Sequence, residues 1–255
     1  MVQIKGKKTK SIKKHKTKRS RSKGDGFVFS IAGVHGVGKT TVYLLLQKKL
    51  IENKNILFMP ERLRANPPVP FGSKDKNIAF RAELHYNQQM IKRNEIIKKF
   101  VTNHRERICI SDRTPFTTIA YARALSLPKI DYSLINDTFT SVSWQKDHII
   151  FLNAEPKTIM QRIYHRGSLD ISREKWNEGD FEYLKRVLKK YEEIFIENKI
   201  EKNNRITRIW TENMTAEDVV NRIIEIIEQR TRLLLKKQIK VPVNQSKLTN
   251  WIPEI

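Results

Sequence analysis

A complete phosphate-binding motif lies near the start of the chain. The stretch fits the pattern G-x-x-x-x-G-K-[ST] and consists of Gly33, Val34, His35, Gly36, Val37, Gly38, Lys39, Thr40 and Thr41. In such a glycine-rich loop the backbone N–H groups turn inward around a phosphate, and the dipole of the following helix adds attraction. Lys39 can reach the β- and γ-oxygens of a nucleoside triphosphate, and the Thr40 hydroxyl can ligate Mg²⁺. All nine residues are therefore predicted to bind the nucleotide, with Lys39 in a catalytic role.

Charged residues also follow two further apolar runs. Glu61 could accept a proton from a substrate hydroxyl, hold Mg²⁺ through water, or simply be a solvated loop residue. Asp112 could face the metal across from Thr40, and Arg113 could neutralise charge on a transferred phosphoryl group. The alternative is a surface ion pair at a helix start. The position of Asp112 and Arg113 at a strand end favours catalysis.

Two arginines, Arg162 and Arg166, are spaced four residues apart and share one face of a predicted helix. Guanidinium groups suit phosphate oxygens, and a helix that ends in a charged loop suits a lid over nucleotide phosphates. Basic residues are abundant in this chain, so the pair alone is weak support.

The elements that must position these residues alternate between strand and helix. Strands are predicted at 27–32, 56–59, 108–111, 149–152 and 206–210, and helices at 40–53, 79–100, 115–126, 156–166, 179–198 and 215–238. This alternation predicts an α/β fold with a parallel sheet covered on both faces. The proline-rich segment 62–76 is expected to be a functional loop, because ligands bind beyond the carboxyl ends of parallel strands.

These motifs together resemble the thymidylate kinase and deoxynucleoside kinase superfamily. The resemblance spans about residues 26–229 and is carried by four segments: the phosphate loop, Asp112-Arg113-Thr114 with Ala120-Tyr121-Ala122, Phe151 through Gly167, and Trp210 through Val219. It implies a five-stranded P-loop kinase fold, Mg²⁺ and ATP as cofactors, and γ-phosphoryl transfer to a nucleoside or nucleoside monophosphate. The catalytic set becomes Lys39, Glu61, Asp112, Arg113, Arg162 and Arg166, with Thr40 and Asp112 at the metal.

The acceptor side departs from the thymidylate kinase pattern. Pro60-Glu61-Arg62 replaces the usual Glu-Pro-Gly, and Gln89 takes the place of a phosphate-binding arginine. A glutamine in this helix resembles the nucleoside kinases, where it reads the base edge. His35 stands where thymidylate kinases often carry Asp. The predicted substrate residues are Glu61, Phe71, Gln89 and Arg113. Aromatic residues near a helix, such as Phe71, more often belong to the core, and Gln89 could equally be a solvated helix residue.

The charge of the chain is strongly basic, with 50 Lys and Arg against 27 Asp and Glu. Residues 1–25 are predicted to be a flexible arm that carries 11 Lys and Arg, residues 26–238 the kinase domain, and residues 239–255 a tail. The arm could bind nucleic acid or an acidic partner, or serve only solubility or localisation. With one cysteine, Cys109, and no long apolar stretch, a cytoplasmic protein without a membrane partner is expected. A homodimer stays an open alternative.

Two classes of function therefore compete. The first is a small-substrate nucleoside or nucleotide kinase, favoured by the Asp112-Arg113 pair and the lid arginines. The second is a nucleic-acid-associated P-loop NTPase or polynucleotide-end kinase, favoured by the net charge of +23.

Overall fold

The structure is a computed structural model that describes residues 24–63, 73–166 and 177–235. Five parallel strands form one sheet in the order β2-β3-β1-β4-β5. The strands are β1 (Phe27–Ala32), β2 (Ile56–Met59), β3 (Ile108–Asp112), β4 (His148–Asn153) and β5 (Ile206–Trp210). The predicted α/β fold with a five-stranded parallel sheet is confirmed. Most of the arm, the tail 239–255 and Phe71 lie outside the described residues.

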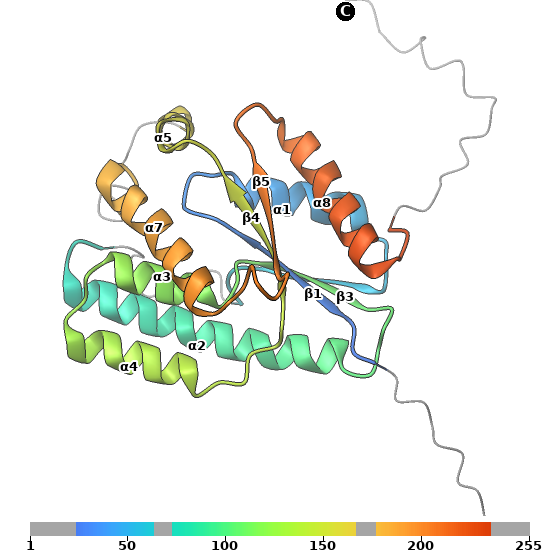
Figure 1. Ribbon diagram of the computed structural model, residues 1–255, viewed down its shortest axis with the longest axis horizontal. Helices are drawn as coiled ribbons and strands as arrows, with labels where there is room; N and C mark the ends of the chain where they lie inside the picture. The colour runs from blue at the N-terminus through green and yellow to red at the C-terminus, as the bar shows by residue number, and fades with distance from the viewer. Residues whose placement is uncertain (1–23, 64–72, 167–176, 236–255) are drawn as a thin grey trace, which may run out of the picture.

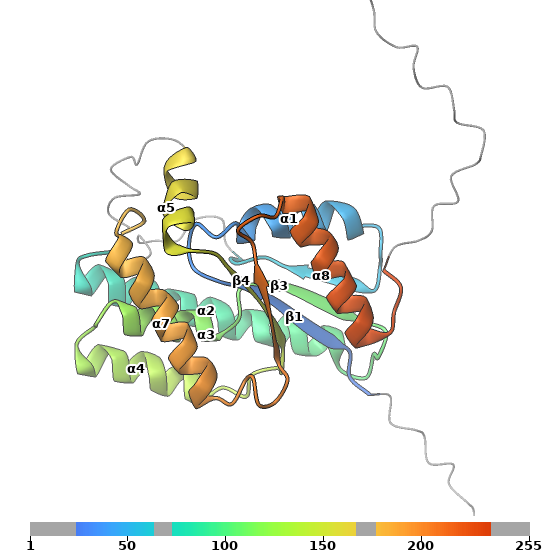
Figure 2. The same ribbon diagram turned by 45° about the horizontal axis from the view of Figure 1, so that its top comes forward.

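Helices cover both faces of the sheet (Figures 1 and 2). The helices in the described ranges are α1 (Lys39–Leu50), α2 (Lys76–Val101), α3 (Phe116–Ala124), α4 (Lys129–Thr140), α5 (Pro156–His165), α7 (Phe181–Glu197) and α8 (Ala216–Thr231). Helices α1 and α8 lie on one face, while α2, α3, α4 and α7 lie on the other. Helix α5 stands beyond the carboxyl end of β4.

The central strand β1 is buried on both faces because its residues are apolar almost without interruption. Phe29 and Ile31 are 1% and 0% exposed, and Ser30 is the one polar residue of the strand. Near-continuous apolar runs are typical of parallel strands packed between two helix layers. The same packing encloses Cys109, and burial raises the pKa of its thiol to about 12, as expected for an inert cysteine. No helix within the described ranges is long and apolar enough to span a membrane.

Two helix predictions were wrong. Helix α4 was missed, because Ile135 and Phe139 are its only buried residues and its sequence therefore carries a weak apolar period. The last helix ends at Thr231 rather than at residue 238. Arg232 takes a left-handed backbone conformation with φ of 59°, which terminates the helix.

Candidate active site

The phosphate loop joins the carboxyl end of β1 to the first turn of α1. Two of its glycines, Gly33 and Gly36, are required by space as well as by backbone conformation. A Cβ at Gly33 would lie 2.5 Å from the Leu152 carbonyl oxygen of β4, and one at Gly36 would lie 2.6 Å from the Ile163 side chain of α5. Both glycines also have positive φ, 142° and 79°. The loop is therefore seated directly against β4 and α5.

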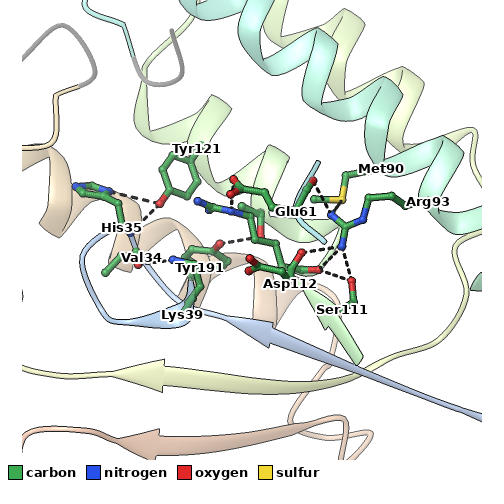
Figure 3. A network of polar contacts seen from close by, with 12 residues as sticks. Val34, His35, Lys39, Glu61, Met90, Arg93, Ser111, Asp112, Tyr121 and Tyr191 are labelled. Atoms are coloured by element: carbon green, nitrogen blue, oxygen red, sulfur yellow. Dashed lines mark hydrogen bonds and ion pairs between the residues drawn. The ribbon is translucent and has the colours of Figure 1, made fainter. Parts of the chain in front are cut away.

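Lys39 is buried beneath this loop and its Nζ donates a hydrogen bond to the Val34 carbonyl oxygen at 2.7 Å (Figure 3). Burial, followed by repulsion from Arg113, lowers the pKa of Lys39 to about 7. Lys39 also lines a cavity beside the loop. This is the position from which a lysine can reach phosphate oxygens bound by the loop.

Glu61 and Arg113 form an ion pair at the ends of β2 and β3, with 2.6 Å between Arg113 Nε and Glu61 Oε1. Burial alone would raise the pKa of Glu61, but Arg113, followed by Lys39 and Arg62, holds it below its usual value. The carboxylate is thus charged at neutral pH. Arg113 has a left-handed backbone, with φ of 71°, and its N–H donates to the Ile31 carbonyl oxygen at 2.9 Å.

Asp112 ends β3 and carries an oxygen, Oδ1, that is buried and has no hydrogen-bond partner among the described residues. Burial raises the pKa of Asp112, while Arg113 and Lys39 oppose that rise. Thr40, in the first turn of α1, is exposed and lines the cavity beside the phosphate loop. An unpaired carboxylate oxygen together with a hydroxyl fits a hard cation such as Mg²⁺, which prefers oxygen ligands.

Arg93 is a buried charged residue of the candidate site that the sequence did not single out. It lies on α2, is 1% exposed, and donates to carbonyl oxygens at the ends of both β2 and β3. Its Nη1 lies 3.2 Å from Glu61 O, its Nη2 lies 2.7 Å from Asp112 O, and Nη2 also donates to Ser111 Oγ. Figure 3 shows this guanidinium between the two strand ends. The helical spacing of Tyr86, Met90, Arg93 and Ile97 was a signal that Arg93 faces inward.

His35 points from the phosphate loop towards an aromatic wall made by Tyr121 of α3 and Tyr183 of α7. Its backbone N–H donates to Tyr121 Oη at 2.9 Å, and its Nδ1 lies 3.4 Å from the same oxygen (Figure 3). Its ring stacks on Tyr183 with centroids 5.7 Å apart. Burial, then repulsion from Lys39, Arg113 and Arg166, lowers the pKa of His35 to about 3, so the imidazole is neutral.

The two predicted lid arginines have different surroundings. Arg162 Nη1 and Nη2 donate to Thr211 Oγ1 and Thr211 O at 2.9 and 2.7 Å, which ties α5 to the loop after β5. Arg166 is exposed and borders the cavities on both sides of the phosphate loop. Arg162 is therefore placed beside one cavity only, whereas Arg166 lies between the two.

Two cavities flank the phosphate loop. The first is lined by Lys39, Glu61, Arg62, Arg113, Tyr121 and Tyr183 among others. The second is lined by Val37, Thr41, Arg162, Thr211, Met214 and Val219 among others. Gly36, Gly38 and Arg166 border both. Such a pair of spaces, joined at one phosphate-binding loop, suits a donor on one side and an acceptor on the other.

Of the predicted substrate residues, Glu61 and Arg113 come together at the first cavity, which we call the acceptor cavity. Gln89 is 4% exposed and lines neither of the two cavities beside the phosphate loop, so its assignment to the substrate stays a prediction. Phe71 lies outside the described residues.

The fold, the phosphate loop and the paired charged residues define a P-loop phosphotransferase. The chain belongs to the deoxynucleoside kinase family, whose sequence profile matches residues 29–233. Family membership makes it an enzyme that transfers a phosphoryl group to a nucleoside or nucleotide. No curated protein sequence matches it significantly.

Solved structures share the fold at low sequence identity. Thymidylate kinase from Candida albicans is 18% identical, with a TM-score of 0.61, and the match covers 84% of this chain and 96% of that one. Deoxyadenosine kinase from M. mycoides with bound dATP is 23% identical, with a TM-score of 0.58, and the match covers 81% of this chain and 100% of that one. At these identities the likeness carries the fold alone.

Proposed function

We propose that the protein transfers the γ-phosphoryl group of ATP, with Mg²⁺, to the 5′-hydroxyl of a deoxynucleoside. The observation that carries this is the charged Glu61 carboxylate, held at the acceptor cavity by Arg113 and close enough to Lys39 for their charges to interact. A hydroxyl acceptor needs a base to take its proton, and an ionised carboxylate serves.

In the proposed reaction the acceptor oxygen attacks the γ-phosphorus while its proton passes to a Glu61 oxygen. The bond between the γ-phosphorus and the bridging oxygen breaks, and ADP leaves. Lys39 and Arg113 neutralise negative charge on the phosphoryl oxygens during transfer, and the loop N–H groups hold the phosphates that stay behind. Arg166, at the border of both cavities, would add charge over the same group.

Thr40 and Asp112 are the residues that would hold Mg²⁺, because they offer a hydroxyl and an unpaired carboxylate oxygen near the loop. A bound Mg²⁺ would offset the negative charge of the phosphates. The second cavity would take the adenosine end of ATP, with Arg162 and Met214 along its wall.

A nucleoside monophosphate is the second candidate acceptor. Its support is the number of cationic side chains at the acceptor cavity, where Lys39, Arg62, Arg113 and Arg166 face two carboxylates, Glu61 and Glu178. Arginine forks bind phosphate oxygens well. The family assignment does not support the alternative of a nucleic-acid-dependent NTPase.

The test is ATP turnover with the four deoxynucleosides and their 5′-monophosphates, with the full chain and a 26–238 fragment. Phosphorylation of at least one deoxynucleoside is expected, and the fragment should retain it if the proposed division into arm, domain and tail is correct. If no deoxynucleoside or monophosphate is phosphorylated, while DNA or RNA stimulates ATP hydrolysis, the proposal is overturned.

A further inference from the structure

Asp147, the residue directly before β4, is a buried carboxylate with a partner on each oxygen. Its Oδ1 lies 2.8 Å from Arg205 Nη2, and its Oδ2 accepts a hydrogen bond from Thr114 Oγ1 at 2.9 Å. Arg205 Nε also donates to the Asp147 carbonyl oxygen at 3.0 Å. Because Arg205 holds Asp147 at two points, the carboxylate offers Thr114 an acceptor of fixed direction.

The bond between Thr114 and Asp147 is a weak device for stability alone. Asp147 is 5% exposed and Thr114 is 0% exposed, so both polar groups have been removed from water. Replacing buried charged groups by well-packed apolar side chains is often neutral or stabilising, and valine has nearly the shape of threonine. A buried polar pair can instead select one conformation of the chain around it.

Arg113, the residue before Thr114, has a backbone conformation that needs such support. Its φ of 71° is left-handed, which a residue with a side chain rarely adopts unless its surroundings hold it there. On the strand side, the Arg113 N–H donates to the Ile31 carbonyl oxygen at 2.9 Å. On the other side, Thr114 is held by Asp147. These two contacts bracket the point from which the Arg113 side chain reaches Glu61.

Asp147 is not itself a residue of the acceptor cavity. It lines a separate cavity with Arg113, Arg93 and Ser111 among others, whereas Arg113 lines both that cavity and the acceptor cavity. An effect of Asp147 on phosphoryl transfer must therefore pass through Arg113.

We propose that Asp147 is a positioning residue for phosphoryl transfer, which acts through Thr114 to fix the backbone turn at Arg113 and so to aim its guanidinium at the acceptor cavity. The inference rests on the proposed function, in which Arg113 neutralises charge on the transferred phosphoryl group. A guanidinium that is free to turn away would meet that group less often, so kcat would fall. The KM for ATP should be unaffected, because the proposed adenosine cavity contains neither Asp147 nor Thr114.

Three variants test the contact itself. Thr114→Val removes the donor but keeps the shape, and it should lower kcat about tenfold with the KM for ATP within about twofold of the parent. Asp147→Leu removes the acceptor and should give a similar loss, since Arg205 is partly exposed and keeps access to water. Thr114→Ser restores the hydroxyl and should stay within about threefold of the parent.

A double-mutant cycle with Arg113 separates positioning from a structural role. In an Arg113→Met background, Thr114→Val should lower kcat by less than about twofold, because no guanidinium is left to aim. The matched control is Thr231→Val, which removes the buried hydroxyl that donates to the Ile227 carbonyl oxygen at 2.8 Å. Thr231 lies about 22 Å along α8 from the end that borders the second cavity. Its Tm should fall, whereas its kcat should stay within about twofold of the parent.

Two results would overturn the proposal while leaving the kinase function intact. One is an unchanged kcat in Thr114→Val and Asp147→Leu. The other is a loss of kcat from Thr114→Val that is equally large in the parent and in the Arg113→Met background, which would mean that the contact does not act through Arg113. Failure of the proposed function would instead appear as a parent enzyme that phosphorylates no deoxynucleoside or monophosphate.

Discussion

The Arg113 guanidinium and the Glu61 carboxylate, 2.6 Å apart, connect two strands that are neighbours in the sheet, although the two residues lie 52 positions apart in the chain. Each side chain is mostly buried, with 10% and 20% exposure respectively. The pair fixes the direction of both groups at the acceptor cavity. It also ties the charge of the proposed base to the presence of the arginine.

This coupling predicts that the effects of substitutions at Glu61 and Arg113 on kcat are not additive. Glu61→Gln should lower kcat by about 10²-fold or more, because the proton of the acceptor hydroxyl loses its base. Arg113→Met should cause a comparable loss and raise the pKa of Glu61, since the largest charge that depresses it is removed. The double variant should be little worse than either single one.

The coupling between Glu61 and Arg113 is tested by measuring kcat/KM at several pH values. With the pKa of Glu61 held below its usual value, the parent should keep its kcat/KM as the pH falls from 8 to about 5, as far as Glu61 is concerned. In Arg113→Met the acid limb should move to higher pH. Losses that simply multiply, with an unmoved acid limb, would mean that the two residues act separately.

Lys39→Ala should reduce phosphoryl transfer by at least about 10²-fold, equal to about 2.7 kcal/mol of barrier, because charge neutralisation in the transition state is lost. The measurement is kcat at saturating ATP. Lys48→Ala, at an exposed site of the same helix, should be indistinguishable from the parent. Transfer within tenfold of the parent in Lys39→Ala would remove this residue from the mechanism.

Arg93→Met should lower both stability and kcat. The carbonyl oxygens of Glu61 and Asp112 would lose a buried donor, which costs about 1–3 kcal/mol for each unpaired group. Chemical denaturation measures the stability, and kcat with KM measures the site. The KM for ATP should change little, because Arg93 lines neither cavity of the site.

Arg93→Lys is the matched comparison, since it keeps one positive charge but loses the fork that spans both strand ends. It should recover part of the stability and less of kcat. If kcat is fully preserved in the destabilised Arg93→Met, Arg93 supports the fold alone.

The low pKa of His35 predicts that the stability of the fold depends on pH. Its pKa is about 3 in the folded protein against 6.5 ordinarily, so the unfolded state binds the proton first. The free energy of unfolding should therefore fall as the pH drops below about 6.5, by at most about 1.4 kcal/mol per pH unit from this group. His148, whose pKa is lowered to about 4 by burial and then by Arg230, should contribute in the same direction.

Urea denaturation between pH 4 and 7 measures the effect in the parent, His35→Asn and His148→Asn. Each variant should show a flatter profile over this range. A His35→Asn profile parallel to that of the parent would show that the imidazole is solvated and titrates normally.

The sequence was sufficient for the sheet because each strand is a short apolar run, and all five were located to within one residue at either end. It was also sufficient for the phosphate loop, since the motif is local. Helix α4 was missed because most of its residues are solvated. Local sequence patterns therefore predicted an element wherever its buried residues recur with a regular spacing.

The site was only partly predictable because its polar contacts join distant segments. Glu61, Asp112 and Arg113 were found from their places after strands. Nothing local indicated that Arg93 would pair with carbonyl groups, or that Glu83 would be buried without a partner. Helical spacing marked both as inward-facing, but the partner of an inward charge depends on which strands and helices surround it.

Strand β1, which carries the phosphate loop at its carboxyl end, is central in the order β2-β3-β1-β4-β5. The two cavities beside that loop are therefore lined largely by different segments of the chain. One cavity is lined by residues that follow β2 and β3 and by residues of α3 and α7, and the other by residues of α5, α8 and the loop after β5. The phosphate loop, the first turn of α1 and Arg166 contribute to both. With the acceptor and ATP in separate cavities, as proposed, substitutions in the segments that line only one cavity should change the preference for one substrate and leave the walls of the other cavity intact.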